Sequence, residues 1–370
     1  MSRRLTVVQL LPELEVGGVE RGTLEIAEAL VAAGHRALVV SAGGRLVDEL
    51  EACGAEHRQL TIGAKRLTSL VHVPALTRLF SSEGVDIVHA RSRLPAWLGR
   101  CALRRMPSAR RPAWVTTVHG PYSVNAYSRI MTSGDAVIAI SAFIRDYIES
   151  NYPEVPANRI TVIPRGVDTR RYHAGFKPDA TWVAAFLRDH PGLVGRTLLT
   201  LPGRLTRWKG QEDFLALIAI LRRAGRPVHG LVIGGAHPRK AGFADELAAR
   251  AGQLGIAADV SFLGQRDDLR ELLAISTIAY SLTGEPEAFG RTTIEALALG
   301  TPVIGYDHGG TGEILTRVYP AGLVAAGDVA AAAARTQALL DSPQAVPHEH
   351  PYTIAAMQAA TIALYERLCR

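Results

Sequence analysis

Cysteine is scarce in this sequence, and the few cysteines are not arranged for cross-linking or metal binding. Cys53, Cys101 and Cys369 lie far apart and form no CxxC or mixed Cys/His motif. This pattern argues against a disulfide-stabilised secreted domain and against a zinc site. We therefore expect a chain that works in a reducing cytoplasm.

Long apolar runs are lacking as well. No stretch of about 18 apolar residues occurs, and Pro12, Glu13 and Glu15 interrupt the first apolar segment before a secretory signal could be complete. We expect neither a membrane span nor a signal peptide. Hydrophobic residues still make up 48% of the 370 residues, enough for a large core, and this length favours two domains.

The usual glycine-rich nucleotide-binding signatures are also missing. Gly17 and Gly18 follow the first apolar segment and open a helical pattern, but the sequence around them matches neither GxGxxG nor GxxxxGK[ST]. The residues needed for a dinucleotide fold or a P-loop are therefore not present there. The two glycines either let a ligand approach closely or simply form a turn.

Positive charge exceeds negative charge only in the first half of the chain. Residues 1–180 contain 23 Lys and Arg against 17 Asp and Glu, whereas residues 181–370 contain 18 of each. Part of the excess is a dense group made up of Arg100, Arg104, Arg105, Arg110 and Arg111. Such a group either docks on anionic lipid headgroups or is an ordinary solvated surface. Nucleic acid is disfavoured because aromatic residues are not interleaved with these arginines.

Short apolar segments alternate with helical patterns along the whole chain, which is typical of parallel sheets with crossover helices. The first series of predicted strands is LTVVQL, ALVVSA, VDIVHA, WVTTVHG, DAVIAIS and RITVIPRG; the second is RTLLTLPGR, PVHGLVIGG, DVSFLG, TIAYSL and TPVIGYD. Helices are predicted over residues 19–33 and 70–82, among others. The fold class is therefore α/β, with two doubly wound, Rossmann-like domains.

The predicted boundaries follow from this alternation. We assign residues 1–170 to the first domain and residues 196–346 to the second. The polar segment 171–195, which lacks a clear period, is interpreted as the linker. Residues 347–370 contain a helical pattern that we expect to pack back on the first domain.

The most informative candidate site follows the predicted strand TIAYSL. Glu287 and Glu295 flank the start of a helix that we expect to begin near Phe289, and Gly290 would let a ligand approach the free N–H groups of the first turn. The eight-residue separation places the two backbones about 10 Å or more apart, so the carboxylates would hold different ends of a long ligand. The alternative is an ordinary helix with one capping and one solvent-facing glutamate.

Three further loops carry candidate residues. Arg204 and Lys209 lie in one strand-to-helix loop, where two cations can neutralise a diphosphate or remain surface charges. His119 ends an apolar strand, at the edge of a parallel sheet where substrates bind, although a histidine satisfied within the protein is common there. The segment DHGGTGEIL either binds a ligand or is a plain helix start.

Together these segments resemble the family 4 retaining glycosyltransferases of the GT-B fold, particularly bacterial enzymes of lipopolysaccharide core and surface polysaccharide synthesis. The resemblance covers nearly the whole chain. It rests on Glu287 and Glu295, which have seven residues between them including AFG, and on the segment EALALGTPVI that starts at Glu295, supported in order by GGVE, TVHG, IPRGVD and GRLTRWKG.

The resemblance implies that the first domain binds the acceptor and the second a nucleotide-diphosphate sugar, UDP- or GDP-linked, in a cleft between two facing domains. Glu287 would bind sugar hydroxyls and Glu295 the ribose. Arg204 and Lys209 would stabilise the departing diphosphate. The remaining contacts would come from the backbone of Phe289 and Gly290, from Thr292, from Gly17 and Gly18, and from His119 at the sugar.

The implied reaction is hexose transfer with retention to a lipid-linked or lipopolysaccharide-type glycan, without metal or cofactor, by a protein peripheral to the inner face of the cell membrane. The absence of a DxD motif agrees with a metal-independent enzyme. Arg165 departs from the family's common IPNGVD segment. A sugar-nucleotide epimerase of the same fold and a nonenzymatic nucleotide-sugar binding protein remain alternatives.

Overall fold

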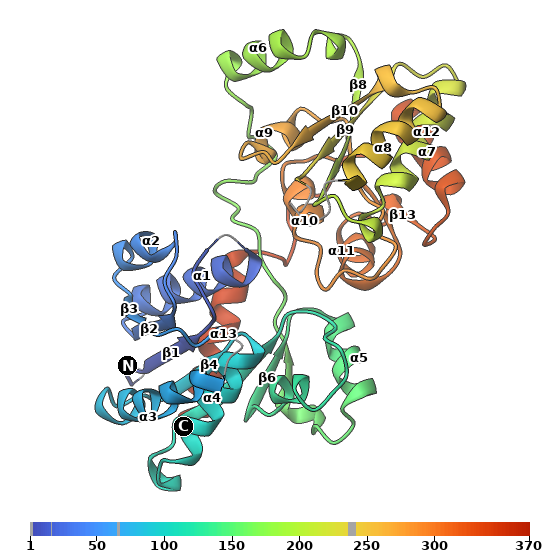
Figure 1. The fold of residues 1–370 in the computed structure, drawn as a ribbon. Coiled ribbons are helices and arrows are strands. Elements are labelled where there is room, and N and C mark those ends of the chain that lie inside the picture. The colour runs from blue at the N-terminus through green and yellow to red at the C-terminus, as the bar shows by residue number, and fades with distance from the viewer. Residues whose placement is uncertain (1–2, 16, 65–66, 236–241) are drawn as a thin grey trace. The chain divides into compact units, whose positions relative to one another are not determined.

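The computed structural model describes residues 3–15, 17–64, 67–235 and 242–370. The chain forms two compact units (Figure 1). Unit 1 comprises residues 1–166 together with Ile354–Arg370, and unit 2 comprises Val167–Thr353. Each unit is an α/β fold around one parallel sheet, so the predicted fold class is confirmed.

Unit 1 contains a seven-stranded sheet in the order β3-β2-β1-β4-β5-β6-β7, in which every pairing is parallel. The order reverses between β1 and β4, which is the position where doubly wound sheets bind ligands. The strands are β1 (Thr6–Leu10), β2 (Arg36–Ser41), β3 (Glu56–Gln59), β4 (Ile87–Ala90), β5 (Ala113–Val118), β6 (Ala136–Ala139) and β7 (Ile160–Val162).

The central strands of unit 1 are almost completely buried because helices cover the sheet. The α-helices are α1 (Gly18–Ala32), α2 (Val47–Ala52), α3 (His72–Ser82), α4 (Arg93–Arg104), α5 (Ala142–Asn151) and α13 (Ile354–Leu368). Short 3-10 helices are η1 (Leu67–Val71), η2 (Ser108–Arg110), η3 (Ser128–Thr132) and η4 (Ala157–Arg159).

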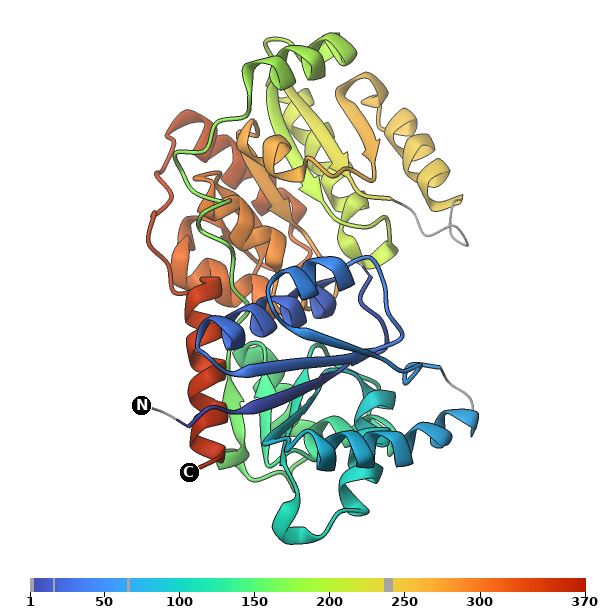
Figure 2. The ribbon, with the colours of Figure 1, turned by 90° about the vertical axis from the view of Figure 1, so that its left-hand side faces the viewer.

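Helix α13 comes from the end of the chain but belongs to unit 1. It packs beside α1, as Figure 2 shows in red and blue. Met357, Leu364 and Tyr365 are buried in the core of this unit. The Tyr365 hydroxyl lies 2.6 Å from Nδ1 of His89, whose Nε2 lies 2.6 Å from the Thr117 hydroxyl. The helix is therefore joined to β4 and β5 by a buried polar chain as well as by apolar contacts.

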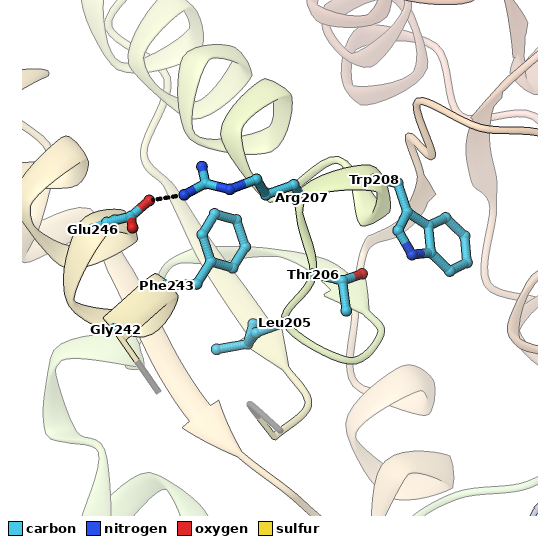
Figure 3. Close-up of a pocket in the computed structure, with 7 residues that line it drawn as sticks. All are labelled: Leu205, Thr206, Arg207, Trp208, Gly242, Phe243 and Glu246. Carbon is cyan, nitrogen blue, oxygen red and sulfur yellow. Dashed lines mark hydrogen bonds and ion pairs between the residues drawn. The ribbon is translucent and has the colours of Figure 1, made fainter. Parts of the chain in front are cut away.

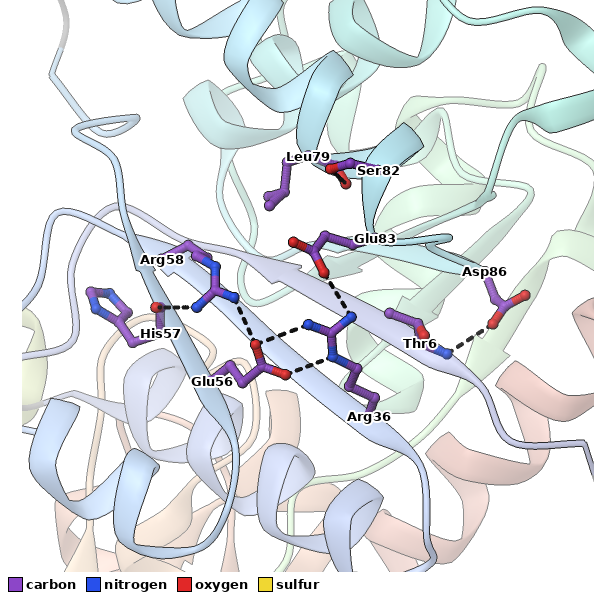
Figure 4. Close-up of polar contacts among 9 residues, drawn as sticks. All are labelled: Thr6, Arg36, Glu56, His57, Arg58, Leu79, Ser82, Glu83 and Asp86. Atoms are coloured by element: carbon purple, nitrogen blue, oxygen red, sulfur yellow. Dashed lines mark hydrogen bonds and ion pairs between the residues drawn. The ribbon is translucent and has the colours of Figure 1, made fainter.

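An ion-pair cluster connects the edge of the sheet to the end of α3 (Figure 4). The Arg36 guanidinium donates to both Glu56 oxygens, at 2.6 and 3.0 Å, and lies 2.8 Å from Glu83. Arg58 donates to Glu56 at 2.8 Å. The hydrogen bonds that Arg36 donates to Glu56 lower the pKa of Glu56, and the same hydrogen bonds raise the pKa of Arg36. The side chains are 26–42% exposed, so we assign the cluster a modest role, holding polar strand β3 in register.

Unit 2 contains a six-stranded parallel sheet in the order β10-β9-β8-β11-β12-β13. The strands are β8 (Thr197–Pro202), β9 (Val228–Ile233), β10 (Val260–Gly264), β11 (Ile278–Ser281), β12 (Val303–Tyr306) and β13 (Leu323–Val324). The α-helices are α6 (Ala180–Asp189), α7 (Gln211–Arg223), α8 (Gly242–Gln253), α9 (Leu269–Ala274), α10 (Arg291–Ala298), α11 (Gly309–Val318) and α12 (Val329–Asp341). The 3-10 helices are η5 (Pro191–Leu193), η6 (Arg207–Lys209), η8 (Ala257–Asp259) and η9 (Pro320–Gly322).

The segment 171–195, interpreted from sequence as a linker, contains helix α6 and belongs to unit 2. The Asp179 side chain caps this helix by accepting from the Thr181 N–H at 2.8 Å. Trp182 stacks on Phe186, with ring centroids 5.2 Å apart, and both pack on the unit 2 core. The few apolar residues of this segment therefore suffice for a helix, because they lie four residues apart on one face.

Candidate functional site

The loop that follows β8 contains Gly210, a position where a side chain would clash with the neighbouring loop. Gly210 has φ +77, and a Cβ there would lie 1.8 Å from the carbonyl oxygen of Leu282, just after β11. The N–H of Gly284 donates to the carbonyl of Trp208 at 2.7 Å. The loops at the carboxyl ends of these two neighbouring strands are thus in backbone contact.

This contact brings together residues that are far apart in the chain. The Lys209 ammonium donates to a carboxylate oxygen of Glu287 and forms an ion pair with it. The two side chains are 17% and 11% exposed. The prediction that both residues lie at the carboxyl edge of this sheet is confirmed by their positions, and the ion pair between them was not predicted.

Lys209 lies in an unusual electrostatic environment. Burial, and secondarily the charge of nearby Arg204, lower the pKa of the Lys209 ammonium to about 8. Arg204 itself is exposed, and its carbonyl accepts from the buried Gln211 amide at 3.0 Å. Two cations on one loop, one of them poorly hydrated, can bind an anion strongly because little water must be displaced from the buried charge.

Helix α10 begins at Arg291, two residues after Phe289, near which the sequence analysis expected it to start. Gly290 precedes the helix with φ +90, a left-handed conformation that ends the loop before helical geometry can begin. Phe289 is 4% exposed, and its ring packs edge-on against Tyr352 with centroids 5.7 Å apart. The Phe289 side chain therefore belongs to the core, which leaves only its backbone for a ligand.

Two glycines of the DHGGTGEIL segment support the Glu287 loop. A Cβ at Gly309 would lie 2.6 Å from the carbonyl oxygen of Glu287, and one at Gly310 would lie 2.3 Å from that of Phe289. The Gly310 N–H donates to the Glu287 carbonyl at 2.7 Å. The sequence left open whether this segment was a site or a helix start; it begins helix α11 and holds the backbone that carries Glu287.

The first turns of α10 carry the remaining predicted residues of unit 2. Glu295 forms an ion pair with Arg291, one turn earlier, at 3.6 Å, and its side chain is 12% exposed. Thr292 is half-buried. Thr293 is 2% exposed, and among the described residues its hydroxyl has no hydrogen-bond partner. Sequence reasoning missed Thr293, because a threonine inside a helical pattern gives no sign of an unsatisfied hydroxyl.

The predicted residues of unit 1 lie at the carboxyl edge of its own sheet. His119 directly follows β5, while Gly17 and Gly18 follow β1 at the start of α1. Gly17 is extended, with φ −174, and a Cβ there would lie 2.3 Å from a carboxylate oxygen of Glu20, the end of a flexible side chain that would have to move. A Cβ at Gly18 would have nothing within 4 Å, so local geometry does not require Gly18 to be glycine. Burial, then the charges of Arg165 and Arg91, hold the pKa of His119 well below its usual value. His119 is accordingly neutral.

Two family models cover most of the chain. The model described as Glycosyltransferase Family 4 matches residues 16–171, and the model described as Glycosyl transferases group 1 matches residues 187–355. The chain belongs to the family 4 glycosyltransferases. The resemblance stated from the sequence is thereby confirmed.

Proteins similar to this glycosyltransferase include a curated glycosyltransferase and solved structures of the same fold. A lipopolysaccharide core biosynthesis mannosyltransferase, LpsB of Rhizobium meliloti, is 30% identical over 60% of this chain and 58% of its own length. A crystal structure of a glycosyltransferase from Rickettsia africae is 26% identical, with a TM-score of 0.86 over 99% of both chains. Anabaena HepE in complex with UDP-glucose is 21% identical, with a TM-score of 0.75 over 99% of this chain and 98% of its own.

The chain spans about half the length, or less, of the first curated relatives that it matches, between 40% and 52%. Among the residues that the structure describes, no helix is both long and apolar enough to cross a membrane.

A hollow also lies beside the Lys209 loop of the glycosyltransferase (Figure 3). It has a volume of about 500 Å³, and its described lining consists of Leu205, Thr206, Arg207, Trp208, Gly242, Phe243 and Glu246. Arg207 lies over the Phe243 ring at 5.0 Å and donates to Glu246 at 2.7 Å. No residue predicted for donor binding lines it, so we place the candidate site at the Lys209–Glu287 ion pair instead.

Proposed function

We propose that this glycosyltransferase moves a hexose from a nucleotide-diphosphate sugar, UDP- or GDP-linked, to a lipid-linked or lipopolysaccharide-type glycan. The observation that carries the proposal is the ion pair of Lys209 with Glu287 beside the exposed Arg204. A diphosphate ester of a sugar presents both an anion for the two cations and hydroxyls for the carboxylate. The mannosyltransferase LpsB and the UDP-glucose complex of HepE support the classes of acceptor and donor.

In this proposal the cations act on the leaving group. As the bond from the sugar to the diphosphate breaks, negative charge grows on the phosphate oxygens, and Lys209 and Arg204 stabilise it. Their two positive charges take the role that a metal ion would otherwise have, so we propose a reaction that needs neither metal nor cofactor. Addition of a chelator should leave the rate of the purified protein unchanged.

The other predicted residues are assigned to the remainder of the donor. Glu287 accepts hydrogen bonds from sugar hydroxyls, assisted by the backbone at Phe289 and Gly290, and Glu295 binds the ribose. Thr292 contacts phosphate, and Gly17 and Gly18 leave room for phosphate or acceptor. His119 contacts the sugar. The acceptor hydroxyl attacks from the face that the diphosphate leaves, so the configuration at the anomeric carbon is retained without a protein nucleophile.

A panel of nucleotide sugars tests the donor assignment. A ligand at 100 times its dissociation constant stabilises a protein by about 2.7 kcal/mol, so the cognate donor should raise the unfolding temperature by several degrees. Transfer of a labelled sugar to glycan acceptors, with the product anomer read by NMR, then tests retention. Stabilisation without transfer to any acceptor would favour a binding protein, and sugar conversion without acceptor would favour an epimerase.

We further propose that the arginines of α4 and the following turn contact anionic lipids at the inner face of the cell membrane. Arg104, Arg105, Arg110 and Arg111 are all exposed, but Arg111 also donates to the carbonyl of Met106 at 2.9 Å and is partly structural. Replacement of Arg104, Arg105 and Arg110 by Gln should weaken sedimentation with phosphatidylglycerol vesicles. The control replaces three exposed arginines of unit 2, namely Arg223, Arg250 and Arg335. Equal binding by both variants would contradict the proposal.

A further inference from the structure

Within the described residues, one ring nitrogen of His119 has a hydrogen-bond partner and the other has none. Its Nδ1 lies 2.8 Å from Nη2 of Arg165. Its Nε2 is buried and, within the part of the chain that the structure describes, has no hydrogen-bond partner. Buried polar atoms are almost always paired in native proteins, so an unpaired ring nitrogen at the carboxyl edge of a parallel sheet indicates a place for a ligand atom.

The hydrogen bond with arginine determines which ring nitrogen of His119 carries the proton. A guanidinium can only donate, so Nδ1 must accept with its lone pair. A neutral imidazole has one proton, which then resides on Nε2. Burial and the nearby charges of Arg165 and Arg91 disfavour a second proton. The unpaired Nε2 is therefore a hydrogen-bond donor, and it suits an oxygen of a ligand.

Arg165 is itself held in place. Its side chain is 7% exposed, and Nη1 lies 3.9 Å from the Met357 sulfur on α13. On the other side, a Cβ at Gly22 would lie 2.2 Å from Nη1. Gly22 is inside helix α1, where glycine is unfavourable compared with alanine. The guanidinium therefore occupies space that only a glycine leaves open.

We propose that Arg165 is a positioning residue, which holds His119 in the Nε2–H form so that the ring donates a hydrogen bond to an oxygen of the donor sugar. The inference rests on the proposed function for the identity of the ligand. It gives a role to the residue at which this chain departs from the common IPNGVD segment. It also excludes His119 as a base, because the free nitrogen already bears a proton.

The tautomer can be measured without any substrate. In the 370-residue chain labelled with ¹⁵N-histidine, two-bond ¹H–¹⁵N spectra distinguish a protonated from an unprotonated ring nitrogen. The protein has 12 histidines, so the His119 signals are assigned by their loss in His119→Gln. We expect His119 to be unprotonated at Nδ1 and protonated at Nε2. A proton on Nδ1 in the wild-type protein would overturn the proposal.

Kinetics separate positioning from a structural role. Arg165→Met should lower kcat/KM for the donor about tenfold, the effect of one misplaced hydrogen bond in a transition state. In a His119→Ala background the same change should cost less than about twofold, because no ring remains to be positioned. Losses that multiply in the double variant would show that Arg165 acts independently of His119 and would overturn the proposal.

Gly22→Ala should disturb the contact between Arg165 and His119 without replacing Arg165 itself. The atom in its way is the end of a flexible side chain, so the guanidinium should move rather than the helix. We expect loss of the fixed tautomer and a fall in kcat/KM similar to that of Arg165→Met. Gly252→Ala is the matched control, since Gly252 is also helical and a Cβ there has nothing within 4 Å.

If one of Arg165→Met and Gly22→Ala folds poorly, the other still tests the proposal, and a wild-type His119 spectrum in the folded variant would refute it. Because the spectra need no nucleotide sugar, failure of this inference is distinguishable from failure of the proposed transfer activity. An inactive protein with the Nε2–H tautomer in place would refute only the activity.

Discussion

The ion pair between Lys209 and Glu287 predicts that replacing both partners by neutral residues restores part of the stability lost in each single variant. The same double replacement should not restore activity. Lys209→Met leaves a carboxylate that is 11% exposed without its cation, and Glu287→Gln leaves an ammonium that is 17% exposed without its anion. Removing one partner of a fully buried pair costs 3–5 kcal/mol. The residual exposure here reduces our expectation to about 2–3 kcal/mol for each single variant.

These free energies correspond to a measurable shift in the unfolding transition of unit 2. For a unit of the size of Val167–Thr353, each kcal/mol lowers the midpoint by about 2–4 °C, so each single variant should lose about 4–12 °C. Met and Gln together bury no charge, so the double variant should be more stable than either single variant. Thermal unfolding followed by circular dichroism, with the wild type alongside, measures all four proteins.

The turnover of the double variant should stay low although its stability partly recovers. If Lys209 stabilises the leaving diphosphate and Glu287 holds the sugar, turnover of both single variants and of the double variant falls at least about tenfold. The reasoning is refuted if the losses in stability simply add in the double variant, since the two groups would then not be paired. Wild-type turnover in Lys209→Met and Glu287→Gln would remove both from the donor site.

Three further predictions follow from single contacts. Because the pKa of Lys209 is about 8 and only the protonated form attracts phosphate, the KM for the donor should rise as the pH increases above about 8, and this rise should be missing in Lys209→Met. Gly210→Ala should destabilise the protein more than Gly225→Ala: both glycines have φ +77, but only at Gly210 would a Cβ meet a backbone carbonyl, so a chemical denaturation series that gives equal losses would contradict the geometry. Tyr365→Phe should cost about 1–3 kcal/mol of unfolding free energy, because Nδ1 of buried His89 loses its partner; an unchanged melting curve would argue against this contact.

Most of the fold could be predicted from the sequence, because buried parallel strands must be continuously apolar. Every strand predicted from an apolar segment is present in the structure. The two strands that were missed lack that signal. β3 has the polar sequence EHRQ at a sheet edge, where ion pairs rather than burial support it, and β13 is only two residues long.

The candidate site was predictable in position and not in its internal contacts. Glu287, Lys209 and His119 all follow strands, and the carboxyl edge of a parallel sheet is a general binding location. Their pairings depend on distances between loops that no periodicity encodes. The Lys209–Glu287 ion pair, the support of the Glu287 backbone by Gly309 and Gly310, and the Arg165–His119 hydrogen bond are of this kind.

Unit 2 is inserted into unit 1, and this affects how the protein is made. The chain leaves unit 1 after Gly166 and returns at Ile354, and at this crossing Val167 donates to the Tyr352 carbonyl at 3.0 Å. Unit 1 therefore lacks α13 until Ile354–Arg370 have emerged from the ribosome, whereas unit 2 has its complete sequence earlier. A nascent or prematurely terminated chain would present a finished second half beside an unfinished first half, with the core positions of Met357, Leu364 and Tyr365 vacant and open to chaperones or proteases.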